Sequence, residues 1–504
     1  MSAPAIRAVR LAFAHADAVP LLEEVSFHIP EGPGFWGLVG ANGVGKTTLL
    51  RLILGELQPT RGSLCVEPAG AGVVLCAQSV DEVPEGAAAL RHGQDRKAHR
   101  LRTRLGLGDA DLERWATLSP GERKRWQVGA ALYAEPDVLL LDEPSNHLDA
   151  EARELLLAAL REFRGTALVV SHDRELLDGL TCGTLRLRAG ALDLVHLPYS
   201  QARTVWESED TAQLERREAA RDRVRAAERR IVAARRDQDA ATHGRSTRVR
   251  MKNRYDSDAR TLGAATLAEW AQARAGQRVS AHHSELARAS AELSALAKVP
   301  KAPGRSLFVG WSPPQRPLLV SLALDELRAG ERVLARDVRV ALQRGDRVHL
   351  RGRNGAGKTT LLGALLQACT LPRERVLYLP QDLSAEASRE VLAEVRAQPA
   401  ELRGRTLSLL AALGVDPDQV LASSQPSCGE ARKLALALAL ARHAWLLILD
   451  EPSNHLDLPS IERLEAALAD YPGALLLVCH DPLLAQRLTT RTWSLSEGAL
   501  DVHA

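Results

Sequence analysis

Short apolar runs, each ending at polar residues, recur along two long stretches of this 504-residue chain. The runs VLLLD (138–142) and ALVVS (167–171) are typical of strands that are buried on both faces of a parallel sheet. Between them, AEARELLLAALREF (150–163) is typical of a helix. This alternation of buried strands and helices predicts an α/β fold, with helices on both faces of a mostly parallel sheet.

Four sequence motifs occur twice, in the same order and at intervals of 308 to 312 residues. The pairs are GANGVGKTT (40–48) with GRNGAGKTT (352–360), SPGE (119–122) with SCGE (427–430), DEPSNHLD (142–149) with the same octapeptide at 450–457, and VVSHD (169–173) with LVCHD (477–481). Repeats at a nearly fixed interval indicate one domain that is duplicated. We therefore predict a first domain over residues 1–200 and a second over residues 307–504.

The segment between the copies, residues 201–306, breaks this pattern, because Arg, Glu, Ala and Gln dominate and strand-like runs disappear. Val279, Leu286 and Leu293 are spaced by seven and form a weak heptad stripe, which suits pairing with an antiparallel helix. We predict two long helices, over 204–241 and 260–297, joined by a loop. A helix of that length reaches about 55 Å at roughly 1.5 Å per residue.

Bulk composition excludes several classes of protein. The chain is 45% hydrophobic and 25% charged, as globular proteins are, and its net charge of +2 means that any basic surface must be local. Six scattered cysteines without a CxxC pair fit a reducing cytoplasm and argue against a disulfide framework. The longest apolar stretch, 434–449, is too short and too charged to span a bilayer. We expect a soluble cytoplasmic protein.

Both glycine-rich segments match the pattern G-x-x-x-x-G-K-[ST], between an apolar strand and an apolar helix start. Glycines let backbone N–H groups surround phosphate oxygens, and the helix N-terminus adds partial positive charge. Lys46 and Lys358 are predicted to contact the β- and γ-phosphates. The predicted phosphate-binding residues are Gly40, Asn42, Gly43, Gly45, Lys46, Thr47 and Thr48 in the first copy, and Gly352, Asn354, Gly355, Gly357, Lys358, Thr359 and Thr360 in the second.

Each DEPSNHLD octapeptide follows an apolar strand, so its first two carboxylates should lie at the carboxyl edge of the sheet, where ligands of open α/β sheets bind. Glu143 and Glu451 are the predicted general bases that polarise the attacking water. The predicted Mg²⁺ ligands are Thr47, Asp142, Thr359 and Asp450.

Two further polar residues in each copy follow apolar runs. His172 and His480 are predicted to contact the γ-phosphate, and a purely structural histidine is the alternative. Gln78 and Gln381 are predicted to sense Mg²⁺ or the attacking water, and a solvated loop glutamine is the alternative.

Taken in order, the phosphate loop, the Gln, the S-x-G-E motif, the apolar run with D-E-P and the His resemble the ATP-binding-cassette (ABC) ATPases. The S-N-H-L-D tail resembles the ABC-F subfamily, whose usual form has Thr where this chain has Ser145 and Ser453. The resemblance covers nearly the whole chain and implies two cassettes that sandwich two ATP molecules head to tail. The S-x-G-E residues that would face the opposite phosphate loop are Ser119 and Gly121 in one site, and Ser427 and Gly429 in the other.

Two departures from the family pattern bear on the ATP sites. The usual L-S-G-G-E reads L-S-P-G-E at 118–122 and P-S-C-G-E at 426–430, so we expect two working sites, with the Cys428 site the slower. Adenine usually stacks on an aromatic residue in this family. His15 stands at that place in the first copy, whereas no aromatic residue stands near Leu327 in the second.

The stretch GRSTRVRMKNR (244–254), near the predicted hairpin tip, holds five cations and no acid, namely Arg245, Arg248, Arg250, Lys252 and Arg254. Such a tip suits contact with RNA phosphates, and a solvated helix face is the alternative. The resemblance implies a monomeric protein that binds the ribosome, through rRNA alone or through rRNA and tRNA, in its ATP-closed state, and either acts on translation or protects against antibiotics. The ATPase subunit of a transporter with separate membrane subunits is the main alternative, and a DNA-associated clamp ATPase is another.

Overall fold

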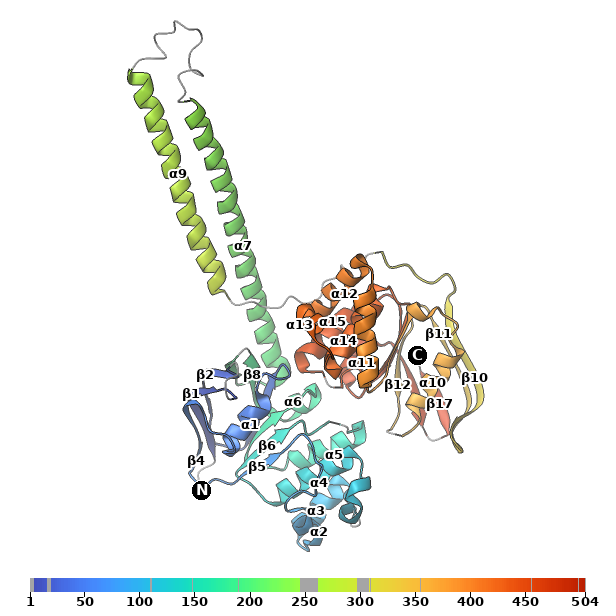
Figure 1. Ribbon diagram of the computed structural model, residues 1–504. Helices are drawn as coiled ribbons and strands as arrows, with labels where there is room; N and C mark the ends of the chain where they lie inside the picture. The colour runs from blue at the N-terminus through green and yellow to red at the C-terminus, as the bar shows by residue number, and fades with distance from the viewer. Residues whose placement is uncertain are drawn as a thin grey trace. The chain divides into compact units, whose positions relative to one another are not determined.

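The computed structural model describes residues 4–15, 20–108, 111–146, 148–188, 190–244, 262–296, 308, 310–353, 355–454, 456–496 and 498–503. The chain divides into two compact units: Met1–Ala202 together with Ala302–Ala504, and Arg203–Lys301. The first unit contains two α/β cassettes and the second a helical hairpin, so the predicted fold class is confirmed (Figure 1).

The first cassette is built on a six-stranded sheet of order β5-β6-β7-β3-β8-β9, in which only β9 is antiparallel to its neighbour. Its strands are β3 (Gly34–Gly40), β5 (Val73–Cys76), β6 (Val138–Asp142), β7 (Thr166–Val170), β8 (Thr181–Arg188) and β9 (Ala191–Val195). Its helices are α1 (Lys46–Leu54), α2 (Ala87–His92), α3 (Arg96–Leu105), the 3-10 turn η1 (Asp111–Thr117), α4 (Pro120–Tyr133), α5 (Ala150–Leu160) and α6 (Arg174–Leu180).

The second cassette repeats this topology as the sheet β13-β14-β15-β12-β16-β17. Its strands are β12 (Arg347–Arg351), β13 (Val376–Leu379), β14 (Leu446–Asp450), β15 (Ala474–Val478), β16 (Arg491–Ser496) and β17 (Ala499–His503). Its helices are α10 (Lys358–Ala368), the 3-10 turn η4 (Arg373–Arg375), α11 (Ala385–Ala397), α12 (Ala400–Ala412), α13 (Pro417–Ala422), α14 (Cys428–Ala441), α15 (Leu458–Ala469) and α16 (Pro482–Leu488).

Each cassette also carries an antiparallel sheet that the sequence analysis did not predict. The first has the order β2-β1-β4, from β1 (Ala5–Phe13), β2 (Leu22–Ile29) and β4 (Arg61–Glu67); the second pairs β10 (Leu318–Ala329) with β11 (Arg332–Gln343). Along β2, buried and exposed residues mostly alternate, because only one face of this sheet is covered. One face of the main sheet therefore packs on α1 and this smaller sheet, and helices cover the other.

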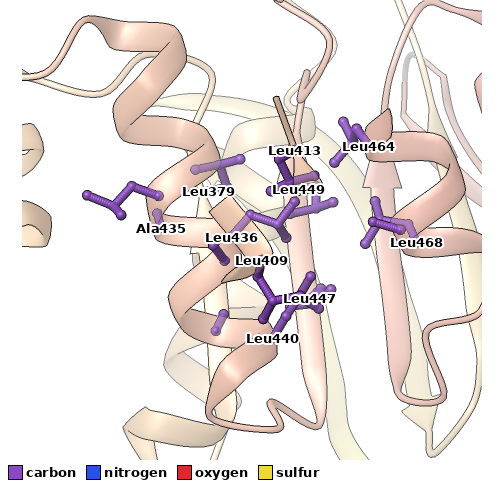
Figure 2. Packing of buried hydrophobic residues seen from close by; sticks show 14 of the residues in the cluster. Leu379, Leu409, Leu413, Ala435, Leu436, Leu440, Leu447, Leu449, Leu464 and Leu468 are labelled. Atoms are coloured by element: carbon purple, nitrogen blue, oxygen red, sulfur yellow. The ribbon is translucent and has the colours of Figure 1, made fainter. Parts of the chain in front are cut away.

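The strand β14 shows how the apolar runs build the core. All five of its residues are buried, and successive side chains point to opposite faces of the sheet. Leu447 and Leu449 pack toward α14 and α12, where Leu436 and Leu409 meet them (Figure 2). Leu446 and Ile448 belong to the core on the other face. A continuous apolar run is therefore needed because both faces of the strand are covered.

The second unit is formed by most of α7 (Tyr199–Gly244) and by α9 (Leu262–Ala295), which run side by side (Figure 1). The sequence predicted helices over 204–241 and 260–297, and α7, with 46 residues, is longer than expected and extends about 70 Å at roughly 1.5 Å per residue. Arg223 of α7 pairs with Glu292 of α9 at 2.8 Å, and Arg217 donates to the Leu296 carbonyl oxygen at 2.9 Å. The antiparallel helical hairpin is therefore confirmed.

Small side chains, together with Ile231, form the seam of this hairpin. Ala220, Ala227 and Ala234 of α7 are buried and are spaced by seven, opposite a helix in which Ala289 is buried. Alanine lets two helices approach closely but gives little hydrophobic contrast in the sequence, so the pattern of α7 was missed. The cationic residues Arg245, Arg248, Arg250, Lys252 and Arg254 lie outside the described residues.

Candidate nucleotide sites

The phosphate loop of each cassette connects a central strand to a helix. In the first cassette it links β3 to α1, and Gly45, the residue before the helix, has a φ of 108° that only glycine adopts readily. A side chain at Gly40 would place its Cβ 2.4 Å from the Leu187 carbonyl oxygen. Two of the predicted glycines are therefore required by backbone geometry. Of the predicted phosphate-binding residues, Asn354 lies outside the described part of the chain.

The lysine of each loop folds back over the loop. Lys46 Nζ donates hydrogen bonds to the carbonyl oxygens of Gly40 (2.8 Å) and Ala41 (2.9 Å), and Lys358 does the same to Gly352 (2.7 Å). Burial lowers the pKa of both lysines, and the nearby glutamate of each cassette opposes that shift. An ammonium group that donates to backbone carbonyl oxygens of its own loop is well placed to turn to phosphate oxygens, so the loops fit a nucleoside triphosphate.

The predicted metal ligands meet in both cassettes. Thr47 Oγ1 lies 2.8 Å from Asp142 Oδ2, and Thr359 Oγ1 lies 3.2 Å from Asp450 Oδ2. Hydroxyl and carboxylate oxygens suit Mg²⁺, which takes its remaining ligands from water and phosphates. In the described part of the chain no group of three or more His, Cys, Asp or Glu side chains forms a metal site on its own. Magnesium bound here would therefore depend on nucleotide oxygens.

Each predicted catalytic glutamate is buried against its predicted histidine. Glu143 Oε2 accepts a hydrogen bond from the His172 backbone N–H (3.2 Å), and Glu143 Oε1 lies 3.1 Å from His172 Nε2. In the second cassette, Glu451 Oε1 lies 3.3 Å from His480 Nε2. The φ of Glu143 is 49° and that of Glu451 is 47°, a left-handed conformation that is unfavourable for glutamate. Strain at matching positions in both copies is typical of functional sites.

Burial sets the proton affinities of these pairs. It raises the pKa of Glu143 to about 8, against the opposing effect of Lys46, and raises that of Glu451 to about 7. It lowers the pKa of His172 to about 3 and that of His480 to about 4. Each site thus pairs a carboxyl group that can hold a proton near neutral pH with a neutral imidazole. That combination suits a general base for water.

Each S-x-G-E motif begins a helix. Ser119 caps α4 and Ser427 caps α14, and each serine forms a reciprocal capping box with the glutamate three residues later. Pro120 occupies the first turn of α4, where proline needs no N–H partner, so this departure from the family pattern fits the fold. Both helix ends could receive an anion, but no described contact joins either serine to the opposite phosphate loop. The head-to-tail pairing through these serines stays a prediction, as do the roles of Gln78 and Gln381, which are exposed.

The last aspartate of each octapeptide lies close to the phosphate loop of the other cassette. Asp457 Oδ2 accepts a hydrogen bond from the Asn42 backbone N–H at 2.7 Å. Asp149 lines a cavity of about 1400 Å³ together with Lys358 and other residues of the second phosphate loop. These two residues were missing from the predicted site, although the letter-for-letter repeat of the octapeptide, final Asp included, was the available signal. The repeated motif therefore serves both cassettes.

The cassettes also meet through a buried ionic cluster. Arg174 of α6 pairs with Glu465 of α15 at 2.7 Å and with Asp481 at 2.9 Å. The position that matches Arg174 in the second copy is Pro482, so the second cassette lacks the arginine that would make the equivalent cluster. The sequence analysis did not predict this ionic cluster, because the arginine at its centre is not part of the repeated motifs.

The fold and these paired sites define a tandem P-loop protein with two ATP-binding cassettes. The family model described as "ABC transporter" matches residues 22–146 and 335–454. The chain is 30% identical to the tylosin resistance ATP-binding protein TlrC of Streptomyces fradiae, over 95% of each chain. It is 27% identical to the ribosome protection protein VmlR of Bacillus subtilis (strain 168), over 92% of this chain and 82% of that one. The chain belongs to the ABC-F subfamily of ABC ATPases.

Solved structures share the fold. The RNase-L inhibitor aligns with a TM-score of 0.58 at 19% identity, covering 96% of this chain and 87% of that one. In the described part of the chain, no helix is long and apolar enough to cross a membrane.

Proposed function

We propose that this protein binds the ribosome when ATP closes its two cassettes, and that it acts on translation or protects the ribosome against antibiotics. The observation that carries the proposal is the combination of two cassettes, each with a phosphate loop, a threonine–aspartate pair and a glutamate–histidine pair, and of a long helical hairpin between them in the chain. Similarity along 95% of each chain to a protein named for tylosin resistance supports it. If the chain were instead the ATPase subunit of a membrane transporter, the hairpin would have no function.

At each site, different residues of the chain would bind the phosphates, hold the metal ion and activate the attacking water. In the first, Lys46 leaves the Gly40 and Ala41 carbonyl oxygens and binds the β- and γ-phosphates. Thr47 and Asp142 would hold Mg²⁺, which supplies Lewis-acid stabilisation of the phosphate oxygens. The same division applies to the matching residues of the second site, and Mg²⁺ dependence of the ATPase is part of the proposal.

Glu143 accepts a proton from the attacking water, and His172 orients that water and contacts the γ-phosphate. Glu143 is suited to this role because its carboxylate is buried beside His172, with Oε1 3.1 Å from Nε2 of the imidazole that would orient the water. Burial also makes the carboxylate more basic than in solution. Hydrolysis then removes the γ-phosphate from the closed cassettes and lets them open.

The hairpin links the ATP-dependent closing of the cassettes to contact with the ribosome. The pairing of α7 with α9 through an alanine seam and cross-helix ion pairs makes a stiff arm. We propose that the cations at 245–254, in the stretch of sequence that joins α7 to α9, contact rRNA or tRNA phosphates in the cytoplasm, where ribosomes translate. Binding through phosphates should weaken steeply as salt rises.

The test is co-sedimentation of the full chain with ribosomes. The variant E143Q/E451Q binds ATP without supplying the base, so it should accumulate on ribosomes in ATP and be released in ADP. A matched control, E154Q/E386Q, changes two exposed glutamates outside the sites and should behave as wild type. If the E143Q/E451Q protein binds ribosomes no better than wild type in ATP, the switch mechanism is wrong.

A second measurement separates the two proposed roles. The wild-type chain is expressed in a susceptible bacterium, and inhibitory concentrations of ribosome-targeting antibiotics, tylosin among them, are compared with those for the E143Q/E451Q variant. A rise in resistance that requires the glutamates indicates ribosome protection. No rise, together with altered translation in extracts, indicates a translation factor.

A further inference from the structure

A buried cation stands at the same place in both cassettes and is not part of the predicted sites. Lys124 lies on α4, five residues after Ser119, and its side chain is almost fully buried. Its Nζ donates to the carbonyl oxygens of Ala77 (2.6 Å), Gln78 (3.2 Å) and Asp142 (3.1 Å). One ammonium group therefore joins the S-x-G-E helix to the end of β5 and to the end of β6.

The second cassette makes the same connection with a different residue. Arg432, five residues after Ser427, is 1% exposed and uses its two terminal nitrogens separately. Its Nη1 donates to the carbonyl oxygens of Pro380 (2.8 Å) and Gln381, and its Nη2 to those of Asp450 (3.2 Å) and Glu451 (2.8 Å). Lysine and arginine reach the same two loops, so the connection itself, rather than one residue type, is what the two halves share.

Burying a cation is costly unless its hydrogen bonds are satisfied. Burial lowers the pKa of Lys124 and of Arg432, and the neighbouring carboxylates oppose that shift. The acceptors are backbone carbonyl oxygens that lie next to functional side chains: Asp142 precedes Glu143, and Gln78 is the predicted sensor. A core residue without a donor would remove these hydrogen bonds, including the buried ones to the Asp142 and Asp450 carbonyl oxygens, so the cation fixes the backbone that carries the predicted general base.

We infer that Lys124 and Arg432 are positioning residues that transmit the position of each S-x-G-E helix to the catalytic glutamate of the same cassette. Five residues of helix, about 7.5 Å at roughly 1.5 Å per residue, separate the serine from the cation. The inference rests on the proposed function, in which Ser119 faces the nucleotide of the second site while Glu143 works in the first. Lys124 would then make hydrolysis in the first site depend on nucleotide in the second, and Arg432 the reverse.

The test uses the full chain without ribosomes, in two backgrounds. In E451Q only the first site hydrolyses ATP, and in E143Q only the second. Adding K124M should lower kcat about ten- to a hundredfold in the E451Q background, since misplacing a catalytic group by about 1 Å costs up to a hundredfold. In the E143Q background K124M should change kcat less than twofold, and R432M should show the opposite preference. Affinity for a fluorescent ATP analogue should stay within twofold of the parent.

Conservative substitutions of Lys124 distinguish a positioning role from a role in packing alone. K124R should retain most of the activity, because Arg432 already does this task in the second cassette. K124Q, a neutral donor of similar length, covers the case in which K124M fails to fold, and it should also lower kcat only in the E451Q background. Exposed arginines supply matched controls, R96M and R389M, which should leave both backgrounds unchanged.

Equal loss of activity in both backgrounds, or a K124M protein that hydrolyses ATP at the parental rate in E451Q, would overturn the inference. A wild-type chain that binds ATP but hydrolyses none would overturn the proposed function, and this inference with it.

Discussion

Replacing Trp126 by Phe should destabilise the first cassette and leave the second untouched. Trp126 lies on α4 and is fully buried in the core that covers the helical face of the sheet. Its Nε1 donates to Asp111 Oδ2 at 2.9 Å, and the same oxygen accepts from the Gly108 backbone N–H at 2.7 Å. The matching position in the second cassette is Leu434, which is also buried but has no polar group.

The expected cost is the sum of two contributions. Losing a hydrogen bond to a largely buried carboxylate costs about 1.5–3 kcal/mol, and the smaller ring leaves a cavity that costs about 1 kcal/mol more. A total of about 3 kcal/mol should lower the melting temperature of a cassette of this size by about 6–12 °C, given about 2–4 °C per kcal/mol.

The assay is differential scanning calorimetry of the full chain, with urea unfolding followed by far-UV circular dichroism. Trp126→Phe, Asp111→Ala and the double variant form a cycle whose coupling energy should be about 1–2 kcal/mol, because both single changes remove the same bond. Leu434→Met, a volume-conserving change in the second cassette, is the control and should cost less than about 1.5 kcal/mol. A Trp126→Phe protein that melts within a degree of wild type, or a cycle with no coupling, would refute this reasoning.

Three further predictions follow from the same structure. Because Thr47 and Thr359 supply one ligand oxygen each, the double alanine variant should lose Mg²⁺-dependent ATP hydrolysis at low Mg²⁺, and a Mg²⁺ titration that matches wild type would contradict this. Burial raises the pKa of Cys76 to about 12, so its thiol stays protonated and should not react with iodoacetamide at pH 8, whereas exposed Cys65 should; mass spectrometry of digests reads the difference, and faster labelling of Cys76 would disprove it. Ala227→Glu places a charge in the alanine seam and should separate α7 from α9 without altering ribosome-free ATPase activity; unchanged protection in hydrogen exchange would count against the seam.

Local sequence predicted the parts of this protein that depend on neighbouring residues. The apolar runs at 138–142 and 446–450 form buried strands, because a strand covered on both faces has no room for polar positions. The glycines of the phosphate loops marked backbone that only glycine adopts, as Gly45 does. Because the domain is duplicated, each motif occurs twice. The threonine, aspartate, glutamate and histidine residues of both sites were therefore predicted from the sequence, before the structure showed which of them lie close together.

Tertiary structure alone decided which distant groups meet. Nothing near Lys124 in the sequence shows that its ammonium reaches the ends of two strands, and nothing near Asn42 shows that its N–H reaches Asp457. The alanine seam of the hairpin could not be predicted from the sequence either. Alanine differs little in hydrophobicity from its neighbours, yet it packs closely when another helix covers it. The sequence by itself therefore determined the two cassettes and the helical arm, and it predicted the residues that would carry ATP chemistry. How those residues are connected through buried cations and carboxylates depends on long-range packing, because the strength of such contacts comes from burial that only the folded chain provides.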